Sequence, residues 1–315
     1  NKIFNNESTY SQDKHHWFAN LPKIGDNEHE FLDSPFNMTE FTAAANSMSP
    51  FSSGGTDNII GKMLQVMIQN KMVATYLLHY FNAIKTFNYV PCAWKGSTTS
   101  LIYKNGSDPH SVNGYRPISL LSVMYKTYSS MINTRCMMMI EKYSLIPKTQ
   151  NGFMPSRETS YCINALVNQI QAAQDKKMKL HAMYIDFAKA FDSVSYWSIL
   201  ETLKAMNFSP SFVNQIEQLY CSIFTQFKTG FGFTGEVNLH SGVRQGDVIS
   251  PTLFILSLMP LLSKVNQLSL LPLPTGSQDA VYTFADDTLL LASSAADIKA
   301  IYKVCLLYTS PSPRD

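Results

Sequence analysis

Apolar residues recur along the chain at spacings that predict several amphipathic helices. Between residues 59 and 87 they follow a helical spacing, which indicates one long helix or two shorter ones. The same spacing follows Pro117 and returns over residues 158–177. A further helix is expected where Ser250 acts as a cap before a proline in the first turn, and Pro260 should kink it.

Two shorter stretches have the composition of β-strands, and both end in acidic residues. Residues 180–185 form a mostly apolar run that predicts a strand buried on both faces, and Asp186 follows it directly. The sequence VYTFADDTLLLA, residues 281–292, predicts two strands joined by a turn at Asp286 and Asp287. A single aspartate after a strand is most often a turn or cap residue, so Asp186 alone indicates little.

The acidic pair in the predicted hairpin breaks a local rule of strand turns. A two-residue hairpin favours Asn-Gly or Asp-Gly, whereas Asp286 and Asp287 offer two like charges and no glycine for positive φ angles. Three carboxylates from two strand ends would need a counter-charge to remain ionised together. Hard divalent cations supply such a charge, so the pattern predicts a Mg²⁺ site, and two ions about 3.5–4 Å apart would suit phosphoryl transfer.

Composition narrows the class of protein. With 315 residues, of which 45% are hydrophobic and 15% charged, the chain can bury a sizeable core in one large or two modest domains. Its five cysteines show no C-x-x-C spacing, which argues against a zinc site or a disulfide framework and fits an intracellular protein. The longest apolar run is too short to cross a bilayer. The net charge of +2 does not itself indicate nucleic acid, although bases outnumber acids between residues 101 and 160.

Five segments carry a resemblance to a known family. YIDFAKAFDSV, SGVRQGDVISPTLF and FADDTLLLA resemble, in order and separation, the palm-domain sequences of reverse transcriptases from non-LTR (LINE-type) retrotransposons. Upstream, YRPISLLSVMYK and IPKTQNGFMPSRETSYCINAL resemble the finger-domain sequences of the same group. Five ordered matches are a specific signal, unlike a lone F-A-D-D, and they cover about residues 49 to 297.

The resemblance implies an α+β fold: the fingers and palm of a right-hand polymerase, with helices behind a small antiparallel palm sheet. On this basis residues 1–48 form a polar amino-terminal segment, residues 49–179 the fingers and residues 180–300 the palm. Residues 301–315 do not continue the family pattern and are expected to be a tail outside the fold. The thumb that follows the palm in the family is expected to be missing, so the chain resembles a fragment.

The resemblance also implies roles for the acidic residues and their neighbours. Asp186 and Asp286 would bridge two Mg²⁺ ions, and Asp287 would be the outer member of the pair. The carbonyl of Phe187 would face a metal, and Mn²⁺ is an alternative ion. Phe191, five residues beyond Asp186, would lie beneath the sugar of the incoming nucleotide and exclude a 2′-hydroxyl, unless it is simply a core aromatic.

Other residues are assigned to nucleotide or nucleic acid by the same resemblance. Arginine and lysine suit phosphate oxygens because they are cationic, although a surface salt bridge is the competing interpretation for each. Gly242 and Gly246 would let the backbone approach a polymer closely, and Asp247 would be a structural cap or turn acid. The expected nucleotide contacts are Lys104, Arg116, Phe191 and Gln245, and the expected template contacts are Arg157, Arg244 and Gly246.

The implied activity is RNA-directed DNA synthesis in retrotransposition, in which a DNA primer on an RNA template is extended with dNTPs. Three alternatives remain open: an RNA-templated RNA polymerase, against which Phe191 argues; a protein like an intron maturase that binds structured RNA; and a catalytically weak or inactive nucleic-acid-binding remnant. No membrane partner is expected, and the protein should act in the nucleus or the cytoplasm. The pattern leaves the oligomeric state open.

Overall fold

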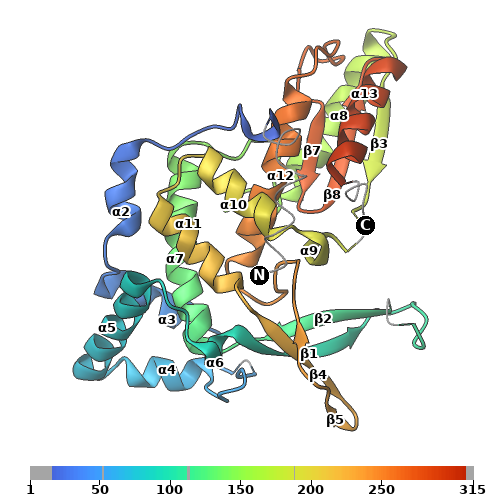
Figure 1. The fold of residues 1–315 in the computed structure, drawn as a ribbon. Helices are drawn as coiled ribbons and strands as arrows, with labels where there is room; N and C mark the ends of the chain where they lie inside the picture. The colour runs from blue at the N-terminus through green and yellow to red at the C-terminus, as the bar shows by residue number, and fades with distance from the viewer. Residues whose placement is uncertain (1–15, 52, 112–113, 188, 310–315) are drawn as a thin grey trace.

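The structure, a computed structural model, describes residues 16–51, 53–111, 114–187 and 189–309 (Figure 1). After a short 3₁₀ turn at Asp26–Glu28, the helices are α2 (His29–Asp33), α3 (Met38–Ser47), α4 (Gly61–Met67), α5 (Lys71–Phe87), α6 (Cys92–Lys95), α7 (Val123–Lys142), α8 (Thr159–Asp175), α9 (Ala190–Ser193), α10 (Tyr196–Ala205), α11 (Pro210–Tyr220), α12 (Ser250–Asn266) and α13 (Ala295–Thr309). The strands are β1 (Gly96–Tyr103), β2 (Tyr115–Leu120), β3 (His181–Ile185), β4 (Phe224–Thr229), β5 (Gly232–Phe233), β6 (Val237–Asn238), β7 (Val281–Phe284) and β8 (Asp287–Ala292).

The smaller sheet holds the strands that the sequence predicts to carry acidic ends. Its order is β3-β8-β7 and all its pairs are antiparallel, as expected for a palm sheet. Leu289 and Leu291 of β8 pack with residues of α8, while Leu290 belongs to the main core with α12 and α13. Helices therefore cover both faces of this sheet rather than one (Figure 1). Because β3 lies at the edge, alternate residues such as Tyr184 are exposed, which corrects the prediction of a strand buried on both faces.

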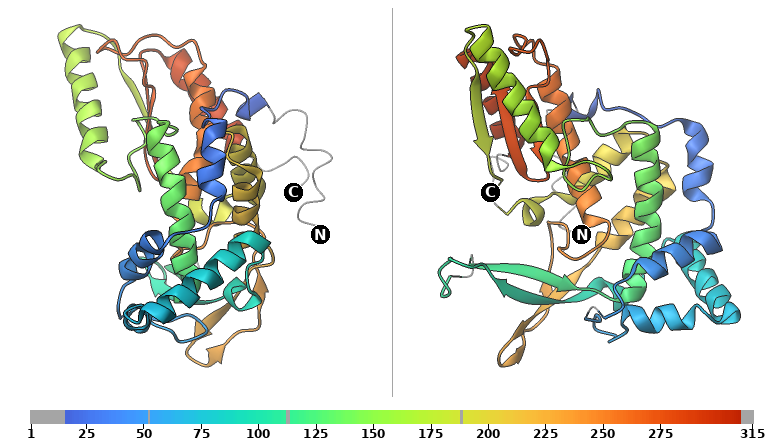
Figure 2. Two further views of the ribbon diagram at one scale, coloured as in Figure 1. Left: turned by 90° about the vertical axis from the view of Figure 1, so that its left-hand side faces the viewer. Right: turned by 180° about the vertical axis from the view of Figure 1, so that it is seen from behind.

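The larger sheet joins segments that lie far apart in the sequence. Its order is β2-β1-β4-β5, with β6 also paired to β4; β1 is antiparallel to β2 and parallel to β4. The β1–β2 and β4–β5 hairpins extend away from the helices (Figure 2). The helix expected after Pro117 begins only at Val123, because YRPISL pairs with β1 as strand β2. Pro117 is tolerated there because β2 is an edge strand.

The other helices predicted from the apolar spacing are present. The stretch expected to form one or two helices forms two, α4 and α5, and the side chain of Asn70 caps α5 by accepting the N–H groups of Met72 and Val73. α12 runs on through Pro260, and its cap is Ile249 rather than the serine that follows. None of the helices in the described ranges combines the length and apolar character that a bilayer crossing requires.

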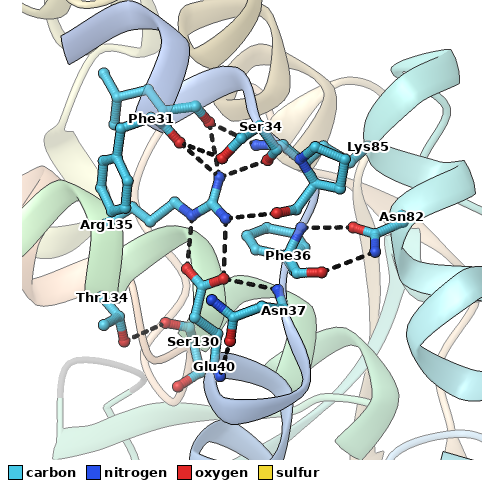
Figure 3. A network of polar contacts seen from close by, with 12 residues as sticks. Phe31, Ser34, Phe36, Asn37, Glu40, Asn82, Lys85, Ser130, Thr134 and Arg135 are labelled. Atoms are coloured by element: carbon cyan, nitrogen blue, oxygen red, sulfur yellow. Dashed lines mark hydrogen bonds and ion pairs between the residues drawn. The ribbon is translucent and has the colours of Figure 1, made fainter. Parts of the chain in front are cut away.

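A buried arginine ties the amino-terminal segment to the core. Arg135 of α7 is 2% exposed, and its guanidinium donates to both carboxylate oxygens of Glu40, at 2.7 and 2.9 Å (Figure 3). Its other hydrogen bonds go to the carbonyl oxygens of Phe31, Leu32, Ser34 and Pro35. Because these acceptors cover all three guanidinium nitrogens and Glu40 balances the charge, burial of the cation is compensated. A segment predicted to be polar is therefore part of the core from Phe18 onward.

The carboxyl-terminal helix α13 packs against β8, β3 and α12. Ile301 is fully buried, and Cys305 is 3% exposed. The hydroxyl of Tyr308 donates to the carbonyl oxygen of Ser257 in α12. The boundary expected at residue 301 therefore falls inside this helix, whereas residues 310–315 of the expected tail lie outside the described residues.

Candidate active site

The acidic residues predicted from the sequence lie at one end of the smaller sheet. Ile185 of β3 pairs with Thr288 of β8, so the next residues on these antiparallel strands, Asp186 and Asp287, lie across from each other. On the other side of β8, Asp287 pairs with Phe284 of β7. Both Asp186 and Asp287 are exposed. Strand pairing thus brings the two predicted acidic segments to the same place on the protein surface.

The turn between β7 and β8 differs by one residue from the prediction. Because Phe284 pairs with Asp287, the two turn residues are Ala285 and Asp286, not Asp286 and Asp287. Ala285 has a φ of 59°, which such a turn favours but which is strained for a residue with a side chain. Ala285 is buried and Asp286 is half-buried. The residue that breaks the local rule is therefore an alanine where glycine would be favoured.

The carboxylates have the chemistry of a Mg²⁺ site but do not form a compact cluster. Across the described residues, no three His, Cys, Asp or Glu side chains gather closely enough to hold a metal ion. A converging trio is therefore not confirmed in this conformation. Like charges at one sheet end repel, which favours the solvated positions of Asp186 and Asp287. Their oxygens, and the carbonyl of half-buried Phe187, are still of the ligand type that Mg²⁺ prefers.

One residue that the sequence analysis missed contacts the acidic turn. Gln150 is fully buried, and its Oε1 atom accepts the N–H groups of Gly152 at 2.8 Å and Ala285 at 3.3 Å. A Cβ on Gly152 would lie 2.1 Å from the nitrogen of Ala285, so only glycine fits there. In the sequence, Gly152 could have indicated that another backbone segment approaches closely at this position. Nothing in the sequence indicates that the approaching segment is the turn.

Phe191 lies in a group of aromatic rings between α12 and the segment that follows Gln150. Its ring stacks on Phe254 of α12, with centroids 4.8 Å apart and planes 9° from parallel. Phe153 meets it edge-on at 5.9 Å. The carbonyl oxygen of Phe191 accepts the N–H of Val243 at 2.8 Å. The residue is half-buried, so it packs in the core and keeps a part at the surface.

The loop between β6 and α12 packs closely against the rest of the chain. Gly246 has a φ of 116°, and a Cβ there would lie 2.6 Å from the carbonyl oxygen of Ser119. Gln245, itself half-buried, accepts the N–H of Ser119 at its carbonyl oxygen, at 2.8 Å. A Cβ on Gly242 would lie 2.8 Å from backbone atoms of Asp192. The predicted close approach exists, but its partner is this chain's own backbone.

Arg244 is buried, which corrects its assignment as a direct template contact. Its side chain is 1% exposed, and its guanidinium lies 4.3 Å from the centre of the Tyr125 ring and 3.8 Å from a carboxylate oxygen of Asp247. Asp247 accepts hydrogen bonds of 2.6 Å from the hydroxyls of Tyr125 and Ser129. A cation enclosed in this way cannot reach a polymer at the surface. Asp247 is therefore a buried structural acid, but its carboxylate binds hydroxyls of α7 rather than a local cap or turn.

The remaining basic residues differ in how far they can reach a ligand. Arg157 is half-buried and donates to two carbonyl oxygens of the loop at residues 146–150, at 2.7 and 2.6 Å, so its guanidinium supports that loop, and its assignment to the template stays a prediction. Arg116 is exposed on the edge strand β2. Lys104, directly after β1, lies near Asp192: partial burial raises the pKa of that carboxyl, and neighbouring lysines including Lys104 oppose the rise.

Comparisons with known proteins bear on this site. The model of the family described as reverse transcriptase (RNA-dependent DNA polymerase) matches residues 102–310, more than half of the chain. The chain is 29% identical over 225 residues to a probable RNA-directed DNA polymerase from transposon X-element of Drosophila melanogaster, covering 71% of this chain and 24% of that protein. It is 26% identical over 288 residues to the RNA-directed DNA polymerase from mobile element jockey of the same species, covering 86% and 30%.

The chain is also similar in sequence to a protein of a differently named retrotransposable element. The chain is 25% identical over 261 residues to a retrovirus-related Pol polyprotein from type-1 retrotransposable element R2 of Popillia japonica. That match covers 82% of this chain and 35% of the relative. The chain therefore spans about a quarter to a third of the length of these curated relatives.

Proposed function

Because the chain belongs to the reverse transcriptase (RNA-dependent DNA polymerase) family, we propose that it copies RNA into DNA by adding dNTPs to a DNA primer during retrotransposition. The observation that carries the proposal is the pairing of β3, β8 and β7, which sets Asp186, Asp286 and Asp287 at one end of a sheet. Relatives named as RNA-directed DNA polymerases of mobile elements support it. Such a reaction takes place where RNA and dNTPs are available, in the nucleus or the cytoplasm.

The acidic residues would hold the metal ions of this reaction. Carboxylate oxygens of Asp186, Asp286 and Asp287, with the carbonyl of Phe187, offer the oxygen ligands that Mg²⁺ or Mn²⁺ prefers. Two bound ions would activate the primer 3′-hydroxyl and stabilise the leaving pyrophosphate. The contribution of the protein is to hold these oxygen ligands in position. Strand pairing fixes the backbones of Asp186 and Asp287, and their exposed side chains would turn toward a shared cation.

Basic and aromatic residues outside the acidic end of the smaller sheet would receive the nucleotide. Arg116 and Lys104, at the β1–β2 hairpin, would bind triphosphate oxygens because arginine and lysine are cationic at neutral pH. Gln245 would donate its side-chain amide to the nucleotide, and Phe191 would lie beneath the sugar. Gly246 would act on the template indirectly, by holding its loop against β2. Phosphoryl transfer depends mainly on such positioning and on charge stabilisation.

The substitution Asp286→Asn tests the proposal with little change in shape. It removes a carboxylate ligand and keeps the turn, so primer extension on an RNA template should fall by at least about 100-fold, since metal ions contribute several kcal/mol of charge stabilisation. The matched control is Asp279→Asn, the same charge change at an exposed position just before β7, which should retain extension. Extension by Asp286→Asn at the rate of the unsubstituted protein would contradict the catalytic assignment.

The same assay separates the alternative functions. A preference for ribonucleotides over dNTPs would indicate an RNA polymerase. Tight binding of structured RNA without extension would indicate a maturase-like protein or an inactive remnant. RNA affinity should be measured beside extension at a stated salt concentration, because phosphate contacts weaken as salt rises.

A further inference from the structure

A short segment runs along the free edge of β7, next to the acidic turn. The carbonyl oxygen of Thr149 accepts the N–H of Thr283 at 2.9 Å, and the N–H of Asn151 donates to the carbonyl oxygen of Thr283 at 2.8 Å. Between them, Gln150 pairs with Thr283 in the parallel sense. Since β7 is the outer strand of the order β3-β8-β7, this segment extends the sheet by one short bridge.

The side chain of Gln150 uses only one of its two polar atoms. Its Oε1 accepts the N–H groups of Gly152 and Ala285, as described above, at 2.8 and 3.3 Å. Its Nε2 is buried and has no hydrogen-bond partner within the described part of the chain. An unpaired buried amide nitrogen is unfavourable. The hydrogen bonds of this side chain are therefore made by its acceptor oxygen alone.

The turn needs support because its conformation is strained. Ala285 has a φ of 59°, in the left-handed region that residues with side chains avoid. Asp286 follows directly, so the backbone angles of Ala285 set the direction in which the Asp286 carboxylate leaves the turn. Gly152 packs against the same alanine, where a Cβ would come within 2.1 Å of its nitrogen. One segment thus holds the turn by a hydrogen bond and by close contact.

The supporting segment is itself anchored. Arg157 donates to the carbonyl oxygens of Pro147 at 2.7 Å and Gln150 at 2.6 Å. Further along, the rings of Phe153 and Phe191 make a T-shaped contact, with centroids 5.9 Å apart. The segment therefore joins the acidic turn to the ring that would lie beneath the sugar, and a displacement at either place would be felt at the other.

We propose that Gln150 is a positioning residue that fixes the Asp286 carboxylate for catalysis by hydrogen-bonding the Ala285 amide. The inference rests on the proposed polymerase function, because it assigns Gln150 to the same reaction. In this role Gln150 touches neither substrate nor metal but holds the backbone that carries a metal ligand. Its loss should slow the chemical step more than it weakens nucleotide binding, because small misplacements of reacting groups lower the rate steeply.

Gln150→Met removes the acceptor oxygen and keeps a side chain of similar length. The amide of Ala285 should then exchange with deuterated solvent at least about tenfold faster. For primer extension, kcat should fall on the order of 10- to 100-fold while KM for dNTP stays within about twofold. Gln150→Glu retains an acceptor oxygen and replaces the unpaired nitrogen with a second oxygen. At a pH low enough to protonate this buried carboxyl, it should keep the slow exchange of Ala285.

Gln169→Met is the matched control. Gln169 is also buried, at 3% exposure, and its amide binds the hydroxyl and the N–H of Thr275, in a loop at the end of β7 opposite the turn. Both methionine variants should lose comparable free energy of unfolding, measured in urea. Only Gln150→Met should also speed exchange at Ala285 and lower kcat.

The outcomes decide between this inference and a purely structural role. Unchanged exchange at Ala285 in Gln150→Met, or equal acceleration in Gln150→Glu or Gln169→Met, would overturn it. A fall in kcat no larger than that of Gln169→Met would overturn the catalytic part. Should the unsubstituted protein extend no primer at all, the proposed function fails, while amide exchange still decides whether Gln150 orders the turn.

Discussion

The ring of Phe191 stacks on Phe254, with centroids 4.8 Å apart, and makes a T-shaped contact with Phe153, with centroids 5.9 Å apart. These two contacts oppose a movement of the ring away from a bulkier sugar, because a rotation would disturb both. A steric gate beneath a nucleotide requires a rigid ring, since ribose and deoxyribose differ only by the 2′-hydroxyl. In the proposed role of Phe191, core packing would therefore support the selection of the sugar.

We expect Phe191→Ala to admit ribonucleotides. Removal of the ring opens space for the 2′-hydroxyl, so the preference for dNTPs, as a ratio of kcat/KM values, should fall about 10- to 100-fold. Competition between the two nucleotides in primer extension measures this ratio. Phe87→Ala, at an exposed aromatic residue that ends α5, should leave it unchanged. An unaltered sugar preference in Phe191→Ala would make Phe191 a core aromatic only.

Glu40 should make stability depend on pH in the acidic range. Burial opposes ionisation of its carboxyl, but hydrogen bonds from Arg135 and from the N–H of Asn37 outweigh burial and lower its pKa below the ordinary 4.5. This stabilisation is complete above pH 4.5 and is lost as the pH falls through the lower folded value. In urea unfolding, Glu40→Gln should flatten the loss of stability at acidic pH. Glu201→Gln, in the surface pair with Lys204, should leave it unchanged.

For single residues, the sequence predicts which acids end strands but not which charges are buried. Asp186 and Asp287 follow or begin apolar runs, and that is a local pattern. Arg244 was assigned to the template by resemblance to the family, and nothing in its local sequence indicates that it is buried. Its enclosure depends on residues far away in the sequence, such as Tyr125, which no local pattern reveals.

At the level of elements, Gly246 sets how closely the loop before α12 approaches β2. Gly246→Ala should lower the free energy of unfolding by at least about 1–3 kcal/mol, because a φ of 116° is strained for alanine and its Cβ would meet the Ser119 carbonyl oxygen at 2.6 Å. Gly276→Ala is the control: its φ is 92° and nothing lies within 4 Å, so it should show the backbone cost alone. Equal losses in urea unfolding would mean that the contact with Ser119 adds nothing.

Helices could be predicted from the sequence more fully than strand pairing. Apolar periodicity depends on neighbouring positions, and α5, α8 and α12 follow it. The segment after Pro117 has helical spacing too, yet pairing with β1 makes its start a strand. The turn at Ala285 was misplaced by one residue because its register is set by the pairing of β7 with β8, not by the preferences of the turn residues. In both cases, tertiary contacts override local preference.

For the whole molecule, residues 301–309, which were expected to belong to a tail outside the fold, are part of helix α13 and contribute to the core. Ile301→Ala should lower the free energy of unfolding by about 2–5 kcal/mol, because the residue is fully buried and its loss leaves a cavity. Leu307→Ala, in the same helix at 66% exposure, should change it by less than about 0.5 kcal/mol. Urea unfolding of both variants measures the difference. A negligible loss for Ile301→Ala would place α13 outside the cooperative core.

The parallel pairing of β1 with β4 constrains how the nascent protein can fold on the ribosome. β1 is synthesised well before β4, because α7, α8, β3, α10 and α11 lie between them in the chain. Until β4 has been translated, one side of β1 remains an open strand edge, which can pair with other chains. A pause in translation between the two strands would therefore leave an intermediate prone to aggregation, although most of its helices had already been made.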